Sequence, residues 1–209
     1  MPLPGAKESI HVKTNKTSPL PRVAAALVVA SLAWLAAGCS VATSTQPIGS
    51  KPVPADSLHL DGTWRGGGGD TFFVRTVDDS AGRLEVATVK TNREGFSLER
   101  LEVLLRQHAD IVLANIRSRD PEPAEDYSFG RLTVVDNTLI LTLAPASAIR
   151  RLALDGVVQA TVTTNRDGGS ESYAVRVTGD FDRLAERLAA PDGWQWLDTA
   201  NPIVLTRQR

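Results

Sequence analysis

The sequence predicts an α+β domain that is mostly β, formed by residues 58–209 as an antiparallel meander or partly closed barrel with about two helices packed on it. Short runs of alternating apolar and polar residues are separated about every 8 to 12 residues by Gly, Asn, Asp or Pro, a pattern typical of antiparallel strands joined by short turns. Two other segments repeat their apolar residues at helical spacing. The length suits a single hydrophobic core.

The first half of the domain consists of predicted strands. Residues 58–64, 71–77 and 83–91 form these runs, with turn residues between them. The four glycines at 66–69 precede a strand and lack the Lys and Ser/Thr of a phosphate-binding loop, so they predict a hairpin tip. Trp64 is predicted to lie in the core, because large aromatic side chains dominate burial in small β-domains.

Residues 96–108 allow two interpretations. Leu98, Leu101 and Leu105 lie at helical spacing, whereas Val103, Leu105 and Gln107 alternate as in a strand. We favour a hairpin that turns at residues 108–110, because the β-branched run that follows has no helix start before it.

The second half combines hairpins with helices. The predicted strands are residues 127–135 and 138–144 around an Asp-Asn turn, 157–163 and 172–177 around a second turn, and a closing strand at 202–207. A helix is predicted over residues 145–155, which begin with Pro and end before Gly156. A second helix is predicted over residues 180–190, with Leu184 and Leu188 on one face and Pro191 as its stop.

The first 38 residues have the order of a bacterial export signal. Lys13, Lys16 and Arg22 precede an uncharged run over residues 23–37, and small residues follow it. As a helix this run would span about 22 Å, short of the roughly 30 Å hydrocarbon core of a bilayer, which argues against an uncleaved transmembrane anchor. The region before the run is long for such a signal, so a translation start at Met1 or at Val12 stays open.

The motif LAAGC resembles the lipobox of bacterial lipoproteins, although Ala36 stands where Leu is usual. This resemblance implies cleavage between Gly38 and Cys39 and attachment of palmitate-type acyl chains to Cys39, the first residue of the mature protein. Two or more acyl chains hold a protein on a membrane durably. If the host is Gram-negative, Ser40 implies transfer to the outer membrane, with the protein exposed to the periplasm.

The segment that follows the lipobox is expected to be a tether. Residues 39–57 are rich in Pro, Ser, Thr and Ala and have no apolar period, so they are predicted to be disordered. The sequence therefore divides into a signal peptide at 1–38, a lipidated Cys and tether at 39–57, and one β-rich domain at 58–209.

The domain resembles small bacterial envelope lipoproteins of unknown function, in which a GTW segment, a β-meander, a helix and a closing strand follow one another. The matching residues are Gly62-Thr63-Trp64, Asp182-Arg183-Leu184 and residues 203–207, with the strand and helix that begin at 138. The resemblance implies a fold and no activity. Gly62-Thr63-Trp64 is also similar to the G-x-W of lipocalins, in which the Trp closes one end of a β-barrel.

Charge and cysteine content exclude some classes of function. Residues 39–209 carry 19 basic and 23 acidic side chains, a net charge of −4, with no basic stripe, so nucleic acid is a poor partner. Cys39 is the one cysteine, which excludes an intramolecular disulfide and a thiolate metal site.

Three groups of residues are candidates for a site. His108 and Asp110 are interpreted as a turn, because the mature part has one other His, His59. An acidic loop lacks the glycine-containing pattern of a Ca²⁺ site and is expected to be solvated. Its members are Asp120, Glu122, Glu125 and Asp126. Trp194 and Trp196 are expected to pack over the second helix, the alternative being an exposed aromatic contact for a partner or glycan.

These observations leave two hypotheses for function. No nucleophile elbow occurs, and we expect neither catalysis nor a cofactor or metal. The first hypothesis is a lipid-anchored envelope lipoprotein that acts through contacts with proteins or with cell-wall polymer such as peptidoglycan. The alternative is a lipocalin-like carrier of a small apolar ligand inside the barrel.

Overall fold

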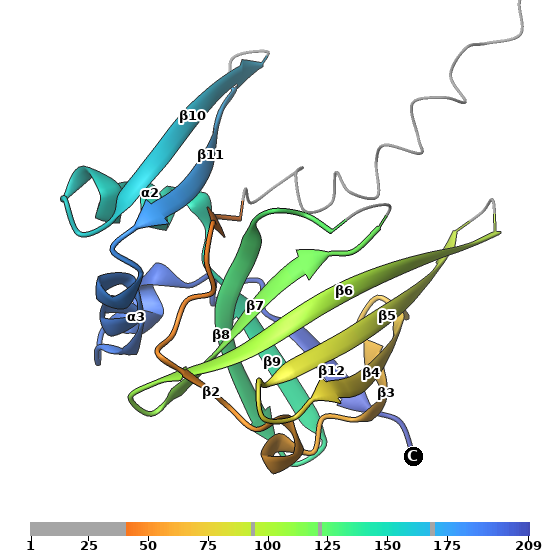
Figure 1. Ribbon diagram of the computed structural model, residues 1–209. Helices are drawn as coiled ribbons and strands as arrows, with labels where there is room; N and C mark the ends of the chain where they lie inside the picture. The colour runs from red at the N-terminus through yellow and green to blue at the C-terminus, as the bar shows by residue number, and fades with distance from the viewer. Residues whose placement is uncertain (1–40, 93–94, 121–122, 168–169) are drawn as a thin grey trace, which may run out of the picture.

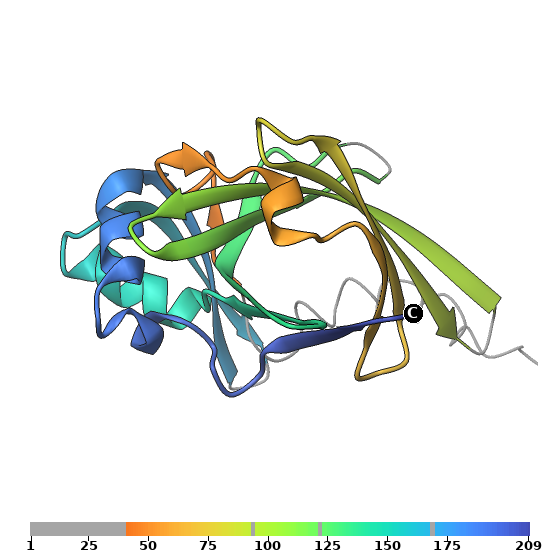
Figure 2. The same ribbon diagram turned by 90° about the horizontal axis from the view of Figure 1, so that it is seen from below.

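The computed structural model describes residues 41–92, 95–120, 123–167 and 170–209, and its centre is a closed antiparallel barrel of eight strands (Figures 1 and 2). The barrel strands are β3 (Gly62–Gly66), β4 (Thr71–Asp78), β5 (Arg83–Asn92), β6 (Gly95–His108), β7 (Ile111–Ser118), β8 (Tyr127–Val135), β9 (Thr138–Leu143) and β12 (Ile203–Arg207). Each strand pairs with the next along the chain, and β12 pairs with both β9 and β3. The predicted fold class is confirmed.

Short turns explain the up-and-down order of the strands. The glycine run forms the tip of the β3–β4 hairpin, where the backbone N–H of Gly69 donates to the carbonyl of Gly66 at 3.0 Å. Ala109 and Asp136 adopt left-handed φ values of 50° and 51° in the β6–β7 and β8–β9 turns. Such values suit tight hairpin turns, whose twist matches that of the strands. The ambiguous segment 96–108 is a strand, and His108 pairs with Ile111 across the predicted turn.

Strand β7 is buried on both faces. Val112, Ala114 and Ile116 alternate with Leu113 and Asn115, so one set faces the barrel interior and the other faces outward. Leu113 and Asn115 are nevertheless fully buried, because a second layer covers this side of the barrel. Double burial accounts for the nearly continuous apolar run at 111–116.

The second layer is an insertion between β9 and β12. It consists of α2 (Ala146–Leu154), β10 (Gln159–Asp167), β11 (Ser170–Gly179), α3 (Phe181–Ala189) and the 3-10 helix η2 (Gly193–Trp196). Leu152, Leu184 and Leu188 from its helices share one apolar cluster with Leu113 and Phe129 on the outside of the barrel. Figures 1 and 2 both show the helices beside the barrel wall, and both predicted helices are confirmed.

The N-terminal segment corrects the prediction of a tether. Of the predicted stretch 39–57, residues 41–57 belong to the domain: β1 (Thr43–Ser44) lies between β8 and β11, β2 (Lys51–Pro52) pairs with β6, and η1 (Ala55–Leu58) is a 3-10 helix. Ala42, Ile48 and Ala55 are fully buried. The composition predicted disorder, but a few buried apolar side chains are enough to hold a segment whose backbone also pairs with the sheet.

Asn115 fastens this segment to the barrel. Its Oδ1 accepts a hydrogen bond from the backbone N–H of Ile48 at 2.6 Å. Its Nδ2 donates to the carbonyls of Ile48 at 3.0 Å and Leu104 at 3.2 Å. The Asn115 side chain thereby binds both the backbone N–H and the carbonyl of Ile48, which is buried and lies between β1 and β2. Buried polar groups need such partners.

We expect Asn115→Ala to lower the free energy of unfolding by about 2–4 kcal/mol, because both backbone groups of Ile48 would stay buried without this partner. The matched control is Asn137→Ala, whose exposed side chain lies in the β8–β9 turn, with an expected change within about 0.5 kcal/mol. Denaturant unfolding measures both changes, and amide exchange should accelerate first at residues 46–53. Equal unfolding midpoints for the two variants would contradict this role.

Candidate functional site

One end of the barrel is closed by an aromatic side chain and its partners. Trp64 is 1% exposed, and its Nε1 donates to the carbonyl of Leu60 at 2.8 Å. The guanidinium carbon of Arg207, on the last strand, lies 4.9 Å from the centroid of the Trp64 ring. Arg207 also donates to the carbonyl of His59, which follows η1 with a left-handed φ of 50°. The confirmed core position of Trp64 thus joins the first strand, the last strand and η1.

The interior wall of the barrel is apolar and retains a little exposed surface. Seven wall side chains from six strands each keep 7–8% of their surface exposed. They are Val74, Val86, Val103, Leu132, Leu139, Leu141 and Leu205. At the closed end, Ala55, Leu60 and Trp64 keep at most 1%. Leu84, Leu105 and Ala114 of the same cluster keep 3%, 0% and 2%, so the interior wall is apolar and buried throughout.

The opposite end of the barrel carries larger apolar side chains that are partly exposed. Phe72, Leu101, Ile116 and Leu143 face inward from four strands, pack against the barrel core, and are only partly buried. Ile116 and Leu143 lie near the ends of β7 and β9, and Leu101 pairs with Ser118, the last residue of β7. Phe72 is nearer the closed end, because it pairs directly with Trp64. We call Leu101, Ile116 and Leu143 the barrel mouth.

A buried charge cluster lies on the outer side of the wall. The side chain of Glu102 is 6% exposed and accepts from Arg117 at 2.6 Å and Arg119 at 3.2 Å. Arg117 also stacks over Tyr127, with 4.9 Å from its guanidinium carbon to the ring centroid. Both carboxylate oxygens of Glu102 bind arginines of the chain, so this residue joins β6 to the end of β7.

The histidine candidates are not assembled into a site. His108 ends β6, Asp110 lies in the following turn, and His59 follows η1. Among the residues that the structure describes, no group of three or more His, Cys, Asp or Glu side chains could hold a metal ion. Cys39, Gly38 and Ser40 lie outside the described residues.

The acidic loop is used for ion pairs. Asp120 accepts from Nε and Nη2 of Arg100 at 3.0 and 2.7 Å, and Asp126 accepts from Arg176 at 2.7 Å. Glu122 lies outside the described residues. The hydrogen bond from the side chain of Arg100, with a second from its backbone N–H, lowers the pKa of Asp120 below its ordinary value. The loop thereby links β6 and β11 to the end of β7.

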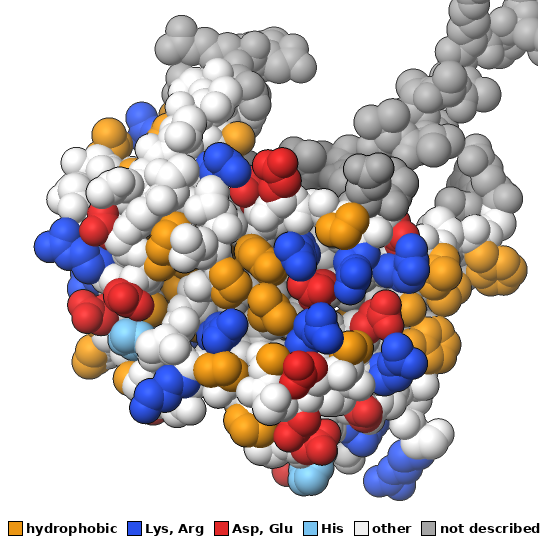
Figure 3. All heavy atoms as spheres, viewed as in Figure 1, with side chains coloured by type: hydrophobic (Ala, Val, Ile, Leu, Met, Phe, Trp, Pro, Cys, Tyr) orange, Lys and Arg blue, Asp and Glu red, His pale blue; other side chains and the backbone are white. Residues whose placement is uncertain are grey.

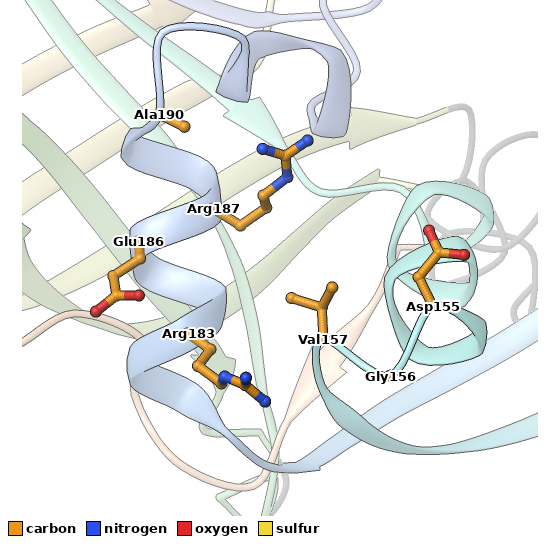
Figure 4. A pocket seen from close by; sticks show the side chains of 7 residues that line it. All are labelled: Asp155, Gly156, Val157, Arg183, Glu186, Arg187 and Ala190. Carbon is orange, nitrogen blue, oxygen red and sulfur yellow. The ribbon is translucent and has the colours of Figure 1, made fainter.

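Two surface pockets lie outside the barrel. One, of about 410 Å³, lies between the end of α2 and α3, with Arg183 and Arg187 facing Asp155 (Figure 4). The other, of about 640 Å³, lies between residues 46–50 and the start of α3. Both linings combine acids with arginine, so neither presents a clear preference for one ligand charge.

The paired tryptophans separate. In an extended chain both side chains would point to the same face, but residues 193–196 form the 3-10 helix η2. Trp196 is therefore 7% exposed, whereas Trp194 is 61% exposed. Arg151 and Arg187 lie 5.1 and 5.2 Å from the ring of Trp196. Packing is thus confirmed for Trp196 and wrong for Trp194.

In comparisons with known proteins, no family model, curated protein or solved structure matches the chain. Within the described part of the chain, every helix is too short or too polar to cross a membrane.

We expect Arg100→Met to raise the pKa of Asp120 toward the ordinary aspartate range, because it removes the side-chain hydrogen bond that is the largest cause of the shift. The pKa of Asp120 is lower in the folded protein than in the unfolded chain. The ion pair therefore stabilises the fold at pH values above the unfolded-state pKa, and this stabilisation is lost as the pH falls through the folded-state pKa. Titration of the side-chain carboxyl carbon by NMR measures the shift. Arg65→Met is the control and should leave the pKa of Asp120 unchanged. An unchanged pKa of Asp120 in Arg100→Met would contradict the role given to Arg100.

Proposed function

We propose that the chain is an exported, lipid-anchored, non-catalytic binding protein whose barrel carries a small apolar ligand. The observation that carries the proposal is a closed barrel with one plugged end and an apolar wall whose side chains keep residual exposure. Eight-stranded barrels have interiors just wide enough for side chains or for one small ligand. An interior wall made of apolar side chains favours an apolar ligand over a charged one.

The direction of entry follows from the two ends. Leu60, Trp64 and Arg207 occupy the closed end with a hydrogen bond and a cation–π contact. The mouth has only apolar side chains that are already partly exposed, so a ligand entering there breaks no described polar contact. Apolar lining with few polar groups selects for hydrophobicity and shape rather than charge.

We expect the chain to bind the apolar fluorescent probe N-phenyl-1-naphthylamine, and Leu143→Trp to weaken that binding about tenfold or more, because an indole at the mouth occupies the entry. Val204→Trp is the matched control: Val204 is exposed on β12 and pairs with Ile140 on the outer face. Circular dichroism checks that both variants fold, and probe titration measures affinity.

Equal probe affinity in the two Trp variants, or no probe binding by the native chain, would exclude the carrier. Native mass spectrometry of the protein from its own host provides the independent readout, since a carrier should retain a co-purified small molecule.

The anchor is proposed from the sequence at residues 35–40. The motif LAAGC supports cleavage before Cys39 and acylation of its thiol, residues 1–38 being the export signal, and Ser40 supports an outer-membrane destination in a Gram-negative host. The described domain begins at Val41, which leaves little chain between lipid and barrel.

We expect Cys39→Ala to abolish incorporation of labelled palmitate and to leave unprocessed precursor, because acylation of the thiol precedes cleavage in proteins with this motif. Metabolic labelling and the mass of the product measure both effects, with Ser40→Ala as the control that keeps acylation. Cleavage at the same place in Cys39→Ala, with no label in the native chain, would refute the anchor.

Contact with envelope proteins or peptidoglycan is the second candidate function. It is favoured by Trp194, which presents most of its indole to solvent from η2. Exposed aromatics are common anchors in protein and glycan recognition. A barrel that binds no probe, together with partners crosslinked at position 194, would favour this candidate over the carrier.

A further inference from the structure

Strands β5 and β6 extend beyond the barrel as a two-stranded arm. On one side β4 ends its pairing at Val89, and on the other β7 ends at Leu101. Beyond those residues β5 and β6 pair only with each other, out to Asn92 and Gly95. Figure 1 shows this arm projecting from the barrel to the right. An isolated two-stranded ribbon is marginally stable in water, so an arm of this kind gains from a surface to lie against.

The outer face of the arm is apolar. Register aligns Val89 with Leu98 and places Phe96 two residues further along β6, on the same face. Phe73 on β4 pairs with Ala87, two residues nearer the barrel than Val89. Phe96 is 81% exposed, Leu98 63% and Phe73 48%. We call Phe73, Val89, Phe96 and Leu98 the arm patch. Such a cluster of exposed large apolar side chains on one face marks an interaction surface.

Arginines border the arm patch. Arg65 belongs to the same cross-strand row as Val89 and Leu98, and Arg100 belongs to the row of Phe73. Figure 3 shows hydrophobic side chains gathered at the right-hand edge, over the arm, with basic side chains beside them. Arg65 is exposed and has no ion pair among the described residues, so its charge is free to meet an anionic surface.

The arm and the start of the described chain lie at the same end of the barrel. β1 pairs with Tyr127 and Ser128, the first residues of β8, and the β5–β6 tip projects from that same end. Cys39 precedes Val41 by two residues, which span at most about 7 Å. An acylated Cys39 would therefore bring the bilayer close to this end of the barrel.

We propose that the arm patch enters the interfacial layer of the same membrane that holds Cys39. The proposal rests on the anchor proposed above. Phe and Leu at the tip would supply apolar burial, and Arg65 would favour anionic headgroups, whereas the charge of Arg100 is already paired with Asp120. Apolar and basic side chains together are typical of segments that lie in a membrane interface. The barrel mouth, at the same end, then faces the lipid, so an apolar ligand passes between bilayer and barrel over a short path.

The test reads lipid contact at the arm tip in the acylated protein. Cys39 is the only cysteine, so acylation leaves an introduced Ser97→Cys thiol at the exposed tip as the unique site for an NBD fluorophore. The protein is reconstituted in vesicles of phosphatidylethanolamine and phosphatidylglycerol with spin-labelled lipid as the quencher. Asn137→Cys, in the exposed β8–β9 turn at the opposite end, is the matched label.

We expect strong quenching at position 97 and little at position 137. Phe96→Ser with Leu98→Ser should reduce quenching at 97 about fivefold, because the apolar contribution to insertion is lost, whereas Val135→Ser, an exposed apolar residue at the opposite end, should not. Equal quenching at the two positions overturns the proposal, and so does quenching at 97 that survives the double substitution. Crosslinking of position 97 to another protein, with no quenching by lipid, overturns it as well.

Failure of the anchor is read separately from the mass of the N-terminal peptide. If Cys39 proves unmodified, the same labels are compared in a Cys39→Ser background with the same vesicles. Lipid quenching at 97 alone then supports the arm contact without the anchor, and its absence overturns the contact.

Discussion

Strand β12 pairs with β9 along one edge and with β3 along the other, and this pairing turns an eight-stranded meander into a barrel. Closure removes the exposed edges that an open sheet would present, so each barrel strand has a partner on both sides along at least part of its length. The same strand brings Arg207 over Trp64 and against the carbonyl of His59. The end of the chain thereby fixes the plug, and the plug fixes which end of the barrel is available to a ligand.

The second layer depends on the barrel in turn. It is inserted between β9 and β12, so it leaves the barrel and returns to it, and its helices cover only the side formed by β6, β7 and β8. Residues 41–53 complete that covering, with Ile48 held by Asn115 and β1 extending the sheet from β8 to β11. One side of the wall is therefore buried on both faces, while the outer faces of β4 and β12 remain exposed at Phe73 and Val204.

Local pattern was enough for most strands and for both helices. Alternation, turn residues and helix stops are properties of neighbouring residues, so the hairpins at Asp136 and the helix that ends before Gly156 could be read directly. The β-branched run after His108 decided the ambiguous segment correctly, because a strand with partners on both sides buries it best. The predicted core position of Trp64 followed from its size alone.

What the sequence did not reveal depends on contacts between distant residues. The contact of Arg207 with Trp64 joins the two ends of the domain, and only the inward alternation of Arg207 with Leu205 could have suggested it. Residues 41–57 have the composition of a linker, yet they are ordered by a side chain 67 positions away, Asn115 acting on Ile48. Trp194 and Trp196 diverge because a short 3-10 helix replaces extended chain. No local period encodes any of these.

The uneven covering of the wall has a consequence for a carrier. Opening a barrel strand on the covered side would expose two apolar layers and break the hydrogen bonds of Asn115, whereas opening β4 or β5 exposes one. Local opening requires less free energy where fewer buried contacts are lost. Fluctuations that admit a ligand should therefore concentrate on β4 and β5, next to the arm, while the covered side keeps its two apolar layers. Because Trp64 on β3 pairs with Phe72 on β4, the plug is the part of the uncovered side that such opening would disturb, and its hydrogen bond to Leu60 and its contact with Arg207 oppose the opening there.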